Sequence, residues 1–354
     1  MAILVCGGAG YIGSHMVAEL LEKGEEVVIL DNFQKGHRDS LLGGKLYSGD
    51  LRDDKILHEI FTENTIDAVI DFAADSLVGE SVTEPLKYFE NNIGSTINLL
   101  KAMRDHNVKY IVFSSTAATY GEPDNIPILE EDKTFPTNPY GESKLAVEKI
   151  LKWCDKAYGI KYTALRYFNA AGAHISGSIG EDHRPESHLI PLILQVALGQ
   201  REKIMVFGDD YNTVDGTCVR DYIHVSDLAN AHLLCVQRLR KGHDSIICNL
   251  GNGKGFSVKE VIDVTRKVTG REIKAEITTR REGDPALLIA SSDKAREILR
   301  WEPKYASLET IIETAWKWHV NHPKGYDKEI KNSKKVVHAS IGKHVELFFV
   351  FCNI

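Results

Sequence analysis

The chain has 354 residues, of which 43% are hydrophobic and 26% are charged, and its net charge is −7 at pH 7. This composition is typical of a globular protein with two domains or one large α/β unit. It excludes a chain-wide basic surface for nucleic acid, although not a local basic site. No apolar run approaches the roughly 20 residues that a membrane-spanning helix needs.

The cysteines favour a reducing compartment. Six are scattered along the chain without a CxxC pair, which does not resemble a disulfide framework. The start of the sequence lacks the basic and apolar regions of a secretory signal. We therefore expect a soluble cytoplasmic protein with neither membrane nor nucleic acid as its partner.

The first half of the chain alternates short apolar runs with helical patterns. Strands are predicted at Ala2–Cys6, Val27–Leu30, Ala68–Asp71, Tyr110–Phe113 and Tyr162–Tyr167. Helices are predicted at His15–Lys23, Asp53–Glu63, Gly94–Asn107 and Tyr140–Tyr158. This alternation predicts an α/β fold with a doubly wound parallel sheet.

After about residue 170 the pattern becomes irregular. Gly172–Pro185 is long and polar, which is typical of a functional loop. Further helices are predicted at Leu189–Gly199, Asp227–Lys241, Ser257–Thr269 and Leu308–Asn321. Beyond Tyr326, a basic run and the apolar stretch Val345–Phe351 indicate a disordered or adventitious tail rather than a membrane or partner anchor.

A glycine-rich turn joins the first predicted strand to the first helix. Gly7, Gly10 and Gly13 stand in a G-x-x-G-x-x-G pattern that lets the backbone approach a pyrophosphate at a helix N-terminus. Asp31 ends the next strand, where its carboxylate would bind the hydroxyls of an adenosine ribose. An acid there favours NAD over NADP, although Lys35 and Arg38 follow closely. Glycines that serve only helix–strand packing are the alternative.

Tyr140 and Lys144 stand four residues apart near a predicted helix start, so their side chains share one helical face. An ammonium beside a phenol lowers the tyrosine pKa towards neutrality, and a bound nicotinamide would act in the same direction. The pair therefore predicts a base that removes a proton from a sugar hydroxyl. An exposed helical pair without a catalytic role is the alternative.

Three hydroxyl residues, Ser114 to Thr116, follow the strand Tyr110–Phe113. They are expected at the carboxyl edge of the sheet, where ligands bind in folds of this kind. A hydroxyl at this edge can hydrogen-bond the reacting oxygen and relay its proton to Tyr140. The three elements together favour catalysis over the structural alternatives.

At this point the sequence resembles the extended short-chain dehydrogenase/reductase family, and within it the enzymes that interconvert UDP-galactose and UDP-glucose by inverting C4. The motifs that carry the resemblance are Gly7–Gly13, Asp31-Asn32, Asp50-Leu51, Phe72-Ala73-Ala74, Gly79-Glu80-Ser81, Asn91-Asn92, Ser114–Gly121, Pro139–Lys144, Leu165–Asn169, Gly216–Val225 and Arg280–Asp284. The resemblance implies a Rossmann-like NAD-binding domain at 1–170, on which later segments pack back. It also implies a smaller α/β domain at 171–326, mainly for the UDP-sugar, and a tail at 327–354.

The resemblance assigns roles to individual residues. Cofactor contacts are implied at Gly7, Gly10, Tyr11, Ile12, Gly13, Asp31, Asn32, Asp50, Leu51, Phe72, Ala73, Ala74, Asn91, Ser114, Tyr140, Lys144 and Tyr167. Substrate contacts are implied at Thr116, Tyr140, Asn169, His188, Leu189, Met205, Phe207, Arg220, Tyr222, Arg281, Asp284 and Leu288. Arg220 and Arg281 would grip the UDP diphosphate, since guanidinium groups suit phosphate oxygens. Tyr140, Lys144 and Thr116 would be the catalytic residues.

The sequence departs from the family pattern at four positions. Thr116 stands where serine is frequent, and it keeps the hydroxyl. Ser76 replaces a lysine near the cofactor phosphates, and His188 replaces an asparagine substrate contact. Cys6 replaces a threonine before the glycine turn, where we interpret it as a small core residue.

The predicted reaction uses NAD that is regenerated in each cycle, with a UDP-hexose as partner. Ala117 and Ala118 follow Thr116, where a dehydratase of this fold would need an acid–base pair, so dehydration is disfavoured. A non-catalytic NAD-sensing protein is disfavoured because Tyr140 and Lys144 remain. Leu288 aligns with a residue that controls entry of N-acetyl groups, so UDP-GlcNAc and UDP-GalNAc stay open as substrates.

Two further expectations concern metals and assembly. The 14 histidines include His183 and His188, but no cysteine set or HExxH motif accompanies them. We therefore interpret these two as loop or pocket residues and expect no metal. The resemblance implies a homodimer formed through the helix Gly94–Asn107 and the helix that carries Tyr140.

Overall fold

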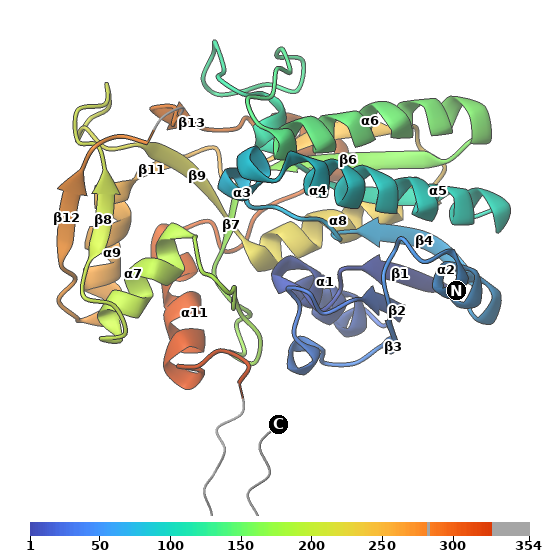
Figure 1. The fold of residues 1–354 in the computed structure, drawn as a ribbon, viewed down its shortest axis with the longest axis horizontal. Coiled ribbons are helices and arrows are strands. Elements are labelled where there is room, and N and C mark those ends of the chain that lie inside the picture. The colour runs from blue at the N-terminus through green and yellow to red at the C-terminus, as the bar shows by residue number, and fades with distance from the viewer. Residues whose placement is uncertain (282–283, 328–354) are drawn as a thin grey trace, which may run out of the picture.

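The computed structural model describes residues 1–281 and 284–327, so the predicted tail lies outside the described residues. A seven-stranded sheet with the order β10-β6-β5-β4-β1-β2-β3 forms the larger part of the molecule (Figure 1). Its strands are β1 (Ala2–Cys6), β2 (Glu26–Asp31), β3 (Lys45–Ser48), β4 (Ile66–Asp71), β5 (Tyr110–Thr116), β6 (Lys161–Tyr167) and β10 (Ile246–Leu250). Every neighbouring pair is parallel, which confirms the predicted doubly wound α/β fold.

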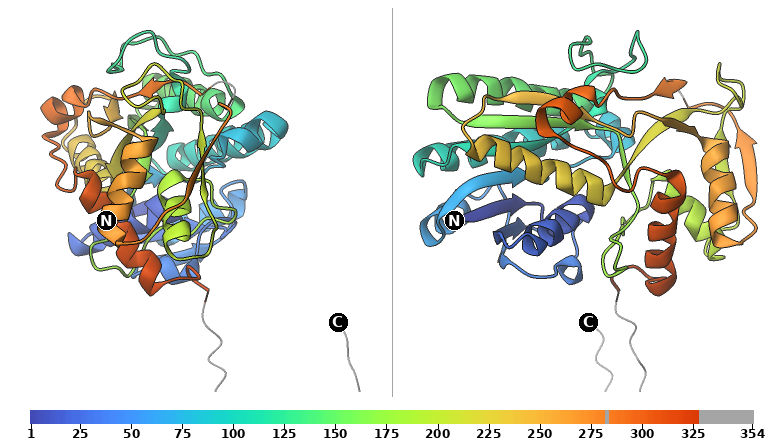
Figure 2. Two further views of the ribbon diagram at one scale, coloured as in Figure 1. Left: turned by 90° about the vertical axis from the view of Figure 1, so that its left-hand side faces the viewer. Right: turned by 180° about the vertical axis from the view of Figure 1, so that it is seen from behind.

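Both faces of this sheet are covered by helices, as its apolar strands require. The two faces bury alternate residues of each strand, so Ile3 packs with α1 and α8 while Leu4 packs with α2, α5 and α6. The helices are α1 (Tyr11–Glu22), α2 (Asp54–Glu63), α5 (Ser95–Asp105), α6 (Pro139–Tyr158) and α8 (Val225–Arg240). The views from the side and from behind show these two helical layers (Figure 2).

A smaller part of the molecule lies at the carboxyl edge of the large sheet, away from α2 (Figure 1). It contains one sheet of β7 (Asn169–Ala171), β9 (Val219–His224), β11 (Gly255–Ser257) and β13 (Leu287–Leu288), and a pair of β8 (Ile204–Phe207) and β12 (Ala275–Thr278). Its helices α7 (Leu189–Ala197), α9 (Val258–Thr269) and α11 (Leu308–Asn321) share a third hydrophobic cluster.

The chain returns from the smaller part to the large sheet. Strand β10 pairs with β6 and forms one edge of the sheet, although it follows β6 by about eighty residues. Helix α10 (Asp293–Leu299) and Trp301 join the same core cluster as β1, and the Trp301 indole donates to the Asp227 carbonyl at 3.0 Å. The predicted domain boundary at residue 170 stays a prediction.

The predicted helices and strands all appear, with ends that differ by a few residues. Helix α1 begins at Tyr11 directly after the glycine turn rather than at His15. The predicted helix Gly94–Asn107 is α5, and a π-helical segment, Phe89–Gly94, precedes it after the short helices α3 (Val78–Thr83) and α4 (Pro85–Tyr88). Strands β3 and β10 were not expected from the sequence. Within the described residues, no helix has the length and apolar character needed to cross a membrane.

Candidate active site

The glycine turn follows a path that larger residues would obstruct. Gly7 has φ of +71°, and a Cβ atom there would lie 2.9 Å from the backbone nitrogen of Ala73. A Cβ atom on Gly13 would lie 2.1 Å from the Gly7 carbonyl oxygen. The turn therefore brings its own backbone close to Ala73 at the end of β4. It also places the N-terminus of α1 at the carboxyl end of β1. These features fit a dinucleotide pyrophosphate at the helix N-terminus.

Replacement of Gly13 by alanine should strongly impair NAD binding. The added methyl group must displace the Gly7 carbonyl and deform the turn. The measurement is the NAD content of the purified protein. Gly94→Ala is the matched control, since no atom lies within 4 Å of a Cβ there and its φ of −61° is helical. Equal NAD content in the two variants would contradict the role of the turn.

Asp31 is buried at the end of β2 and organises the neighbouring backbone. Its Oδ2 accepts from the Ala9 amide and its Oδ1 from the Phe33 amide, both at 2.8 Å. Burial raises the pKa of Asp31, and these backbone hydrogen bonds oppose the shift. Each carboxylate oxygen keeps a further acceptor position for a ribose hydroxyl.

One cleft gathers ten of the predicted cofactor residues. They are Gly7, Gly10, Asp31, Asn32, Asp50, Leu51, Phe72, Ala73, Ala74 and Asn91. The sequence did not single out Gln34, Gly36, Gly49, Asp75 and Ser95, which line the same cleft. Position 36 favours glycine, because a Cβ atom there would lie 2.9 Å from Asp31 Oδ1. The cleft does not include Tyr11, Ile12, Gly13, Ser114, Tyr140, Lys144 or Tyr167.

The start of helix α6 places Tyr140 beside the end of β5. Asn138 caps the helix by accepting from the Gly141 amide at 2.9 Å, and Pro139 occupies the first turn. A Cβ on Gly141 would lie 2.5 Å from the Ala118 carbonyl oxygen, so the helix packs directly on the turn that follows Thr116. Across this contact Thr116 lies close enough to the Tyr140 phenol for its hydroxyl to favour a lower pKa of that phenol.

Among the described residues, the ammonium group of Lys144 contacts Ser114 and Phe113 rather than the expected Tyr140 phenol. Its Nζ donates to the Ser114 carbonyl at 2.8 Å and lies 4.8 Å from the centroid of the Phe113 ring. Burial raises the pKa of Tyr140, while the Thr116 hydroxyl opposes the shift. The expectation that Lys144 lowers this pKa is therefore wrong for the geometry of the protein alone. Tyr140 depends on a further positive charge to become a base near neutral pH.

Asp71, at the end of β4, is a buried acid that sequence reasoning missed. Its carboxylate accepts from the Ala73 amide at 3.1 Å and from the Thr96 hydroxyl at 3.4 Å. Burial lowers the pKa of Lys144 to about 8, and the negative charge of Asp71 opposes that shift. Burial raises the pKa of Asp71 itself to about 6, with Lys144 opposing. The sequence shows only an acid at a strand end, without its partner.

Asp71→Asn should move the alkaline limb of the activity profile to lower pH. The carboxylate stabilises the protonated ammonium, so its loss lowers the pKa of Lys144, by about one unit for a nearby opposite charge. The measurement is kcat/KM against pH. Asp105→Asn, which removes an exposed carboxylate at the end of α5, should leave the limb in place. An unchanged limb in Asp71→Asn would show that the two groups are not coupled.

Strand pairing connects the predicted catalytic residues to the predicted substrate residues. Thr116 is opposite Tyr167 in the β5–β6 pair, and two residues later Asn169 is opposite Tyr222 in the β7–β9 pair. Asn169 also donates to the Asp221 carbonyl at 3.0 Å. The chain therefore passes from the catalytic edge of the large sheet directly into the smaller sheet that carries Arg220.

The smaller part brings together most of the other predicted substrate residues. Arg220 forms an ion pair with Asp284 at 2.7 Å, and Leu288 is opposite Arg220 in the β9–β13 pair. The Arg281 guanidinium lies 3.8 Å from the centroid of the Phe207 ring. Met205 is two residues before Phe207 in β8, so both project from the same half-buried face of that strand.

His188 and Leu189 begin helix α7, at the end of the polar loop. The nearest charged partner of His188 is Glu181, whose Oε1 lies 2.6 Å from His188 Nδ1. Partial desolvation would lower the pKa of His188, but the charge of Glu181 raises it to about 9. Within the part of the chain that the structure describes, no hydrogen bond or ion pair joins His188 to either substrate arginine.

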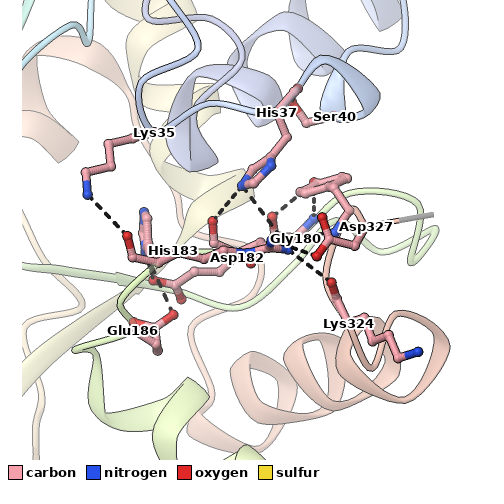
Figure 3. A network of polar contacts seen from close by, with 12 residues as sticks. Lys35, His37, Ser40, Gly180, Asp182, His183, Glu186, Lys324 and Asp327 are labelled. Carbon is pink, nitrogen blue, oxygen red and sulfur yellow. Dashed lines mark hydrogen bonds and ion pairs between the residues drawn. The ribbon is translucent and has the colours of Figure 1, made fainter. Parts of the chain in front are cut away.

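The polar loop is tied to the cofactor-binding part. His37 makes a hydrogen bond of 2.9 Å with the Asp182 carbonyl, and Lys35 donates to the Arg184 carbonyl at 3.3 Å (Figure 3). Tyr11, at the start of α1, donates to the Gly172 carbonyl at 2.7 Å. The loop thus connects the cleft around Gly36 to the substrate side.

The family model described as "NAD dependent epimerase/dehydratase family" matches residues 3–251 of this chain. The chain belongs to this family. The matched residues include the glycine turn, Thr116, the Tyr140–Lys144 pair and Arg220, all of which belong to the candidate site.

Members of the family are similar to the chain over nearly their whole length. A UDP-glucose 4-epimerase of Halalkalibacterium halodurans is 65% identical over 334 residues, which are 94% of this chain and 100% of the relative. The Brucella ovis UDP-glucose 4-epimerase, solved with NAD, is 45% identical with a TM-score of 0.88, covering 89% of this chain and 97% of that one. The UDP-Glc/GlcNAc 4-epimerase of Campylobacter jejuni is 42% identical with a TM-score of 0.80, covering 90% and 99%.

Proposed function

We propose that the chain interconverts UDP-galactose and UDP-glucose by reversible NAD-dependent oxidation at C4 of the sugar. The observation that carries this proposal is the contact between Tyr140 and Thr116, with Lys144 on the same helical face and the glycine turn at the same edge of the sheet. The epimerase activity of relatives up to 65% identical supports it.

The residues of the cleft fit NAD. The glycine turn leaves room for the pyrophosphate, and buried Asp31 offers acceptors for a ribose diol while disfavouring a 2′-phosphate. When bound there, NAD would supply reversible hydride transfer at C4 of the sugar. Its positive nicotinamide ring supplies the charge that the phenol of Tyr140 needs to lose its proton near neutral pH.

The residues of the chain move the proton and hold the sugar. Tyr140 takes the proton of the 4-hydroxyl, and Thr116 hydrogen-bonds the same oxygen and orients it. Lys144 remains an ammonium below its pKa of about 8 and is held at the end of β5 by the Ser114 carbonyl. Tyr140 returns the proton after the 4-keto sugar has turned its other face.

The substrate-side residues anchor the nucleotide while the sugar turns. Arg220 and Arg281 bind the diphosphate, for which Arg220 exchanges its ion pair with Asp284. Asp284 and the Phe207 face contact the uridine, and Asn169 and Tyr222 border the pocket between the two parts. A fixed nucleotide with a free hexose allows both faces of C4 to reach the cofactor.

The test of the proposal is isotopic. The protein, incubated in deuterated water with UDP-galactose, should form UDP-glucose without deuterium at C4, because the hydride returns from the cofactor. Conversion without loss of the C4 hydrogen supports the closed cycle. Substantial deuterium at C4, or no conversion, would overturn it.

A second activity, on UDP-GlcNAc and UDP-GalNAc, is favoured by the size of Leu288. This half-buried residue is opposite Arg220, and leucine leaves more room for an N-acetyl group than a large aromatic residue. The 42% identical relative from Campylobacter jejuni is a UDP-Glc/GlcNAc 4-epimerase. The test compares kcat/KM for the two substrate pairs in the wild type and in Leu288→Tyr. An equal change in kcat/KM for both pairs would exclude Leu288 as the residue that determines acceptance of the N-acetyl group.

We also infer a cytoplasmic homodimer. Five cysteines of the described part are free thiols, in keeping with a reducing compartment. The predicted contact uses α5 and α6; α6 exposes the large apolar side chain of Trp153, and the short helices α3 and α4, which pack on α6, expose Val82 and Leu86. An apolar surface of this kind supports a subunit contact. Light scattering of the purified protein tests it, and a monomer at micromolar concentration would exclude the dimer.

A further inference from the structure

Four side chains at the end of the polar loop and directly after it place nitrogen and oxygen ligand atoms around one point. Glu181, His183, Glu186 and His188, named here the His–Glu cluster, each direct one such atom so that all four lie within 4.8 Å of one another. Glu181 Oε1 lies 2.6 Å from His188 Nδ1 and 3.1 Å from His183 Nδ1. Glu186 oxygens lie 3.5 Å from His188 Nδ1 and 3.8 Å from His183 Nδ1.

The buried carboxylates of the cluster suit a bound cation. The side chains of Glu181 and Glu186 are only 4% and 7% exposed. Two buried carboxylates this close together are costly unless positive charge compensates them. As metal ligands both imidazoles would be neutral, so the cluster would carry a net charge of −2, which one divalent cation neutralises. The ion would displace the proton with which His188 otherwise compensates Glu181.

One ligand atom of the cluster makes no hydrogen bond. Nδ1 of His183 is buried and has no hydrogen-bond partner among the described residues, because its contact with Glu181 has poor hydrogen-bond geometry. Buried polar atoms are rarely left unsatisfied in this way. Glu186, in contrast, is held in place, since its Oε1 accepts from the Ser187 and His188 amides at 2.7 and 2.8 Å.

We propose that the His–Glu cluster is a divalent transition-metal site, best suited to Zn²⁺, that is separate from the hydride chemistry. Ligands about 2.0–2.1 Å from a tetrahedral zinc ion lie roughly 3.3 Å from one another. The four contacts above range from 2.6 to 3.8 Å around that value. Two imidazoles favour zinc over magnesium or calcium, which prefer oxygen ligands.

The ion would fix the loop between the two parts of the molecule. Residues that alternate with the ligands bind outside the cluster: Asp182 contacts His37, and Arg184 pairs with Asp327 at 2.7 Å (Figure 3). The His183 ring also packs edge-on against Tyr11, which begins helix α1. A metal at the centre would hold these contacts in one arrangement. The expectation of no metal rested on the lack of a cysteine set or HExxH motif near these histidines, and the E-x-H-x-x-E-x-H spacing of this segment is neither of these.

Titration of the chelator-treated, NAD-containing protein with Zn²⁺ alone tests the proposal. Calorimetry should show one ion bound per chain, and the visible spectrum with Co²⁺ should show the intense bands of a tetrahedral complex. His183→Ala should weaken Zn²⁺ binding by more than about 100-fold, since even outer partners of metal ligands cost about 10- to 100-fold. Glu186→Gln should weaken it in the same direction.

The matched control is His243→Ala, which removes an exposed histidine outside the cluster and should bind Zn²⁺ like the wild type. Far-ultraviolet circular dichroism confirms that each variant is folded. If His183→Ala fails to fold, the Co²⁺ spectrum of the wild type decides alone. Absence of stoichiometric binding by the wild type, an octahedral Co²⁺ spectrum, or wild-type affinity in folded His183→Ala would overturn the site. None of these readouts depends on epimerase activity.

Discussion

Tyr140→Phe should lower kcat by about 10²- to 10⁴-fold, the range for loss of a general acid–base group. The ring and its packing at the start of α6 remain, so only the proton acceptor is lost. KM for UDP-galactose should change little, because the predicted nucleotide anchors Arg220 and Arg281 are untouched. The measurement is the steady-state conversion of UDP-galactose to UDP-glucose.

Thr116→Ser is the control for the same site. It keeps the hydroxyl beside Tyr140 and removes only a methyl group, so kcat should remain within a few-fold of wild type. NAD content, measured on both variants, separates chemistry from cofactor loss. Full activity in Tyr140→Phe would remove Tyr140 from the role of base.

Glu148→Ala should destabilise the protein by about 3–5 kcal/mol, the cost of breaking a buried ion pair. The side chains of Arg166 and Glu148 are 5% and 3% exposed, and two hydrogen bonds of 2.9 and 2.6 Å join them. Ser115 donates to the same carboxylate. The substitution leaves the Arg166 guanidinium buried without its partner, between β6 and α6.

Urea unfolding of Glu148→Ala gives the change in unfolding free energy. The matched control is Glu276→Ala, which breaks an exposed pair with Lys203 and should cost at most about 1 kcal/mol. Similar losses in the two variants would show that burial of the Glu148 pair adds nothing. Because Ser115 and Thr116 end the same strand, a loss of activity in Glu148→Ala would accompany the loss of stability.

The parallel sheet could be predicted because its strands carry a local signal. β1 is apolar at every position, which marks a strand buried on both faces, and the glycine turn follows it at once. β3 has one buried residue in four and forms the other edge of the sheet, so its pattern is weak. β10 is short, and nothing local in Ile246–Leu250 indicates that it returns to β6.

The residue types of the site could be predicted, but not their orientations. The spacing of Tyr140 and Lys144 fixes a shared helical face, yet the ammonium turns to the Ser114 carbonyl because that acceptor comes from another strand. The coupling of Asp71 to Lys144 is equally non-local, since β4 meets the helix only in the folded chain. The His–Glu cluster is local in sequence, but its convergence depends on the path of a loop without regular structure.

The position of β10 has a consequence for how the chain is made. When the ribosome has synthesised the first 170 residues, β6 is an edge strand whose backbone groups have no partner on one side. The sheet is completed only when residue 250 has emerged, and its hydrophobic cover only after Trp301. A message truncated between these points produces a chain with an exposed strand edge, which readily pairs with a second copy. The two parts of the enzyme therefore reach their folded state together, late in synthesis.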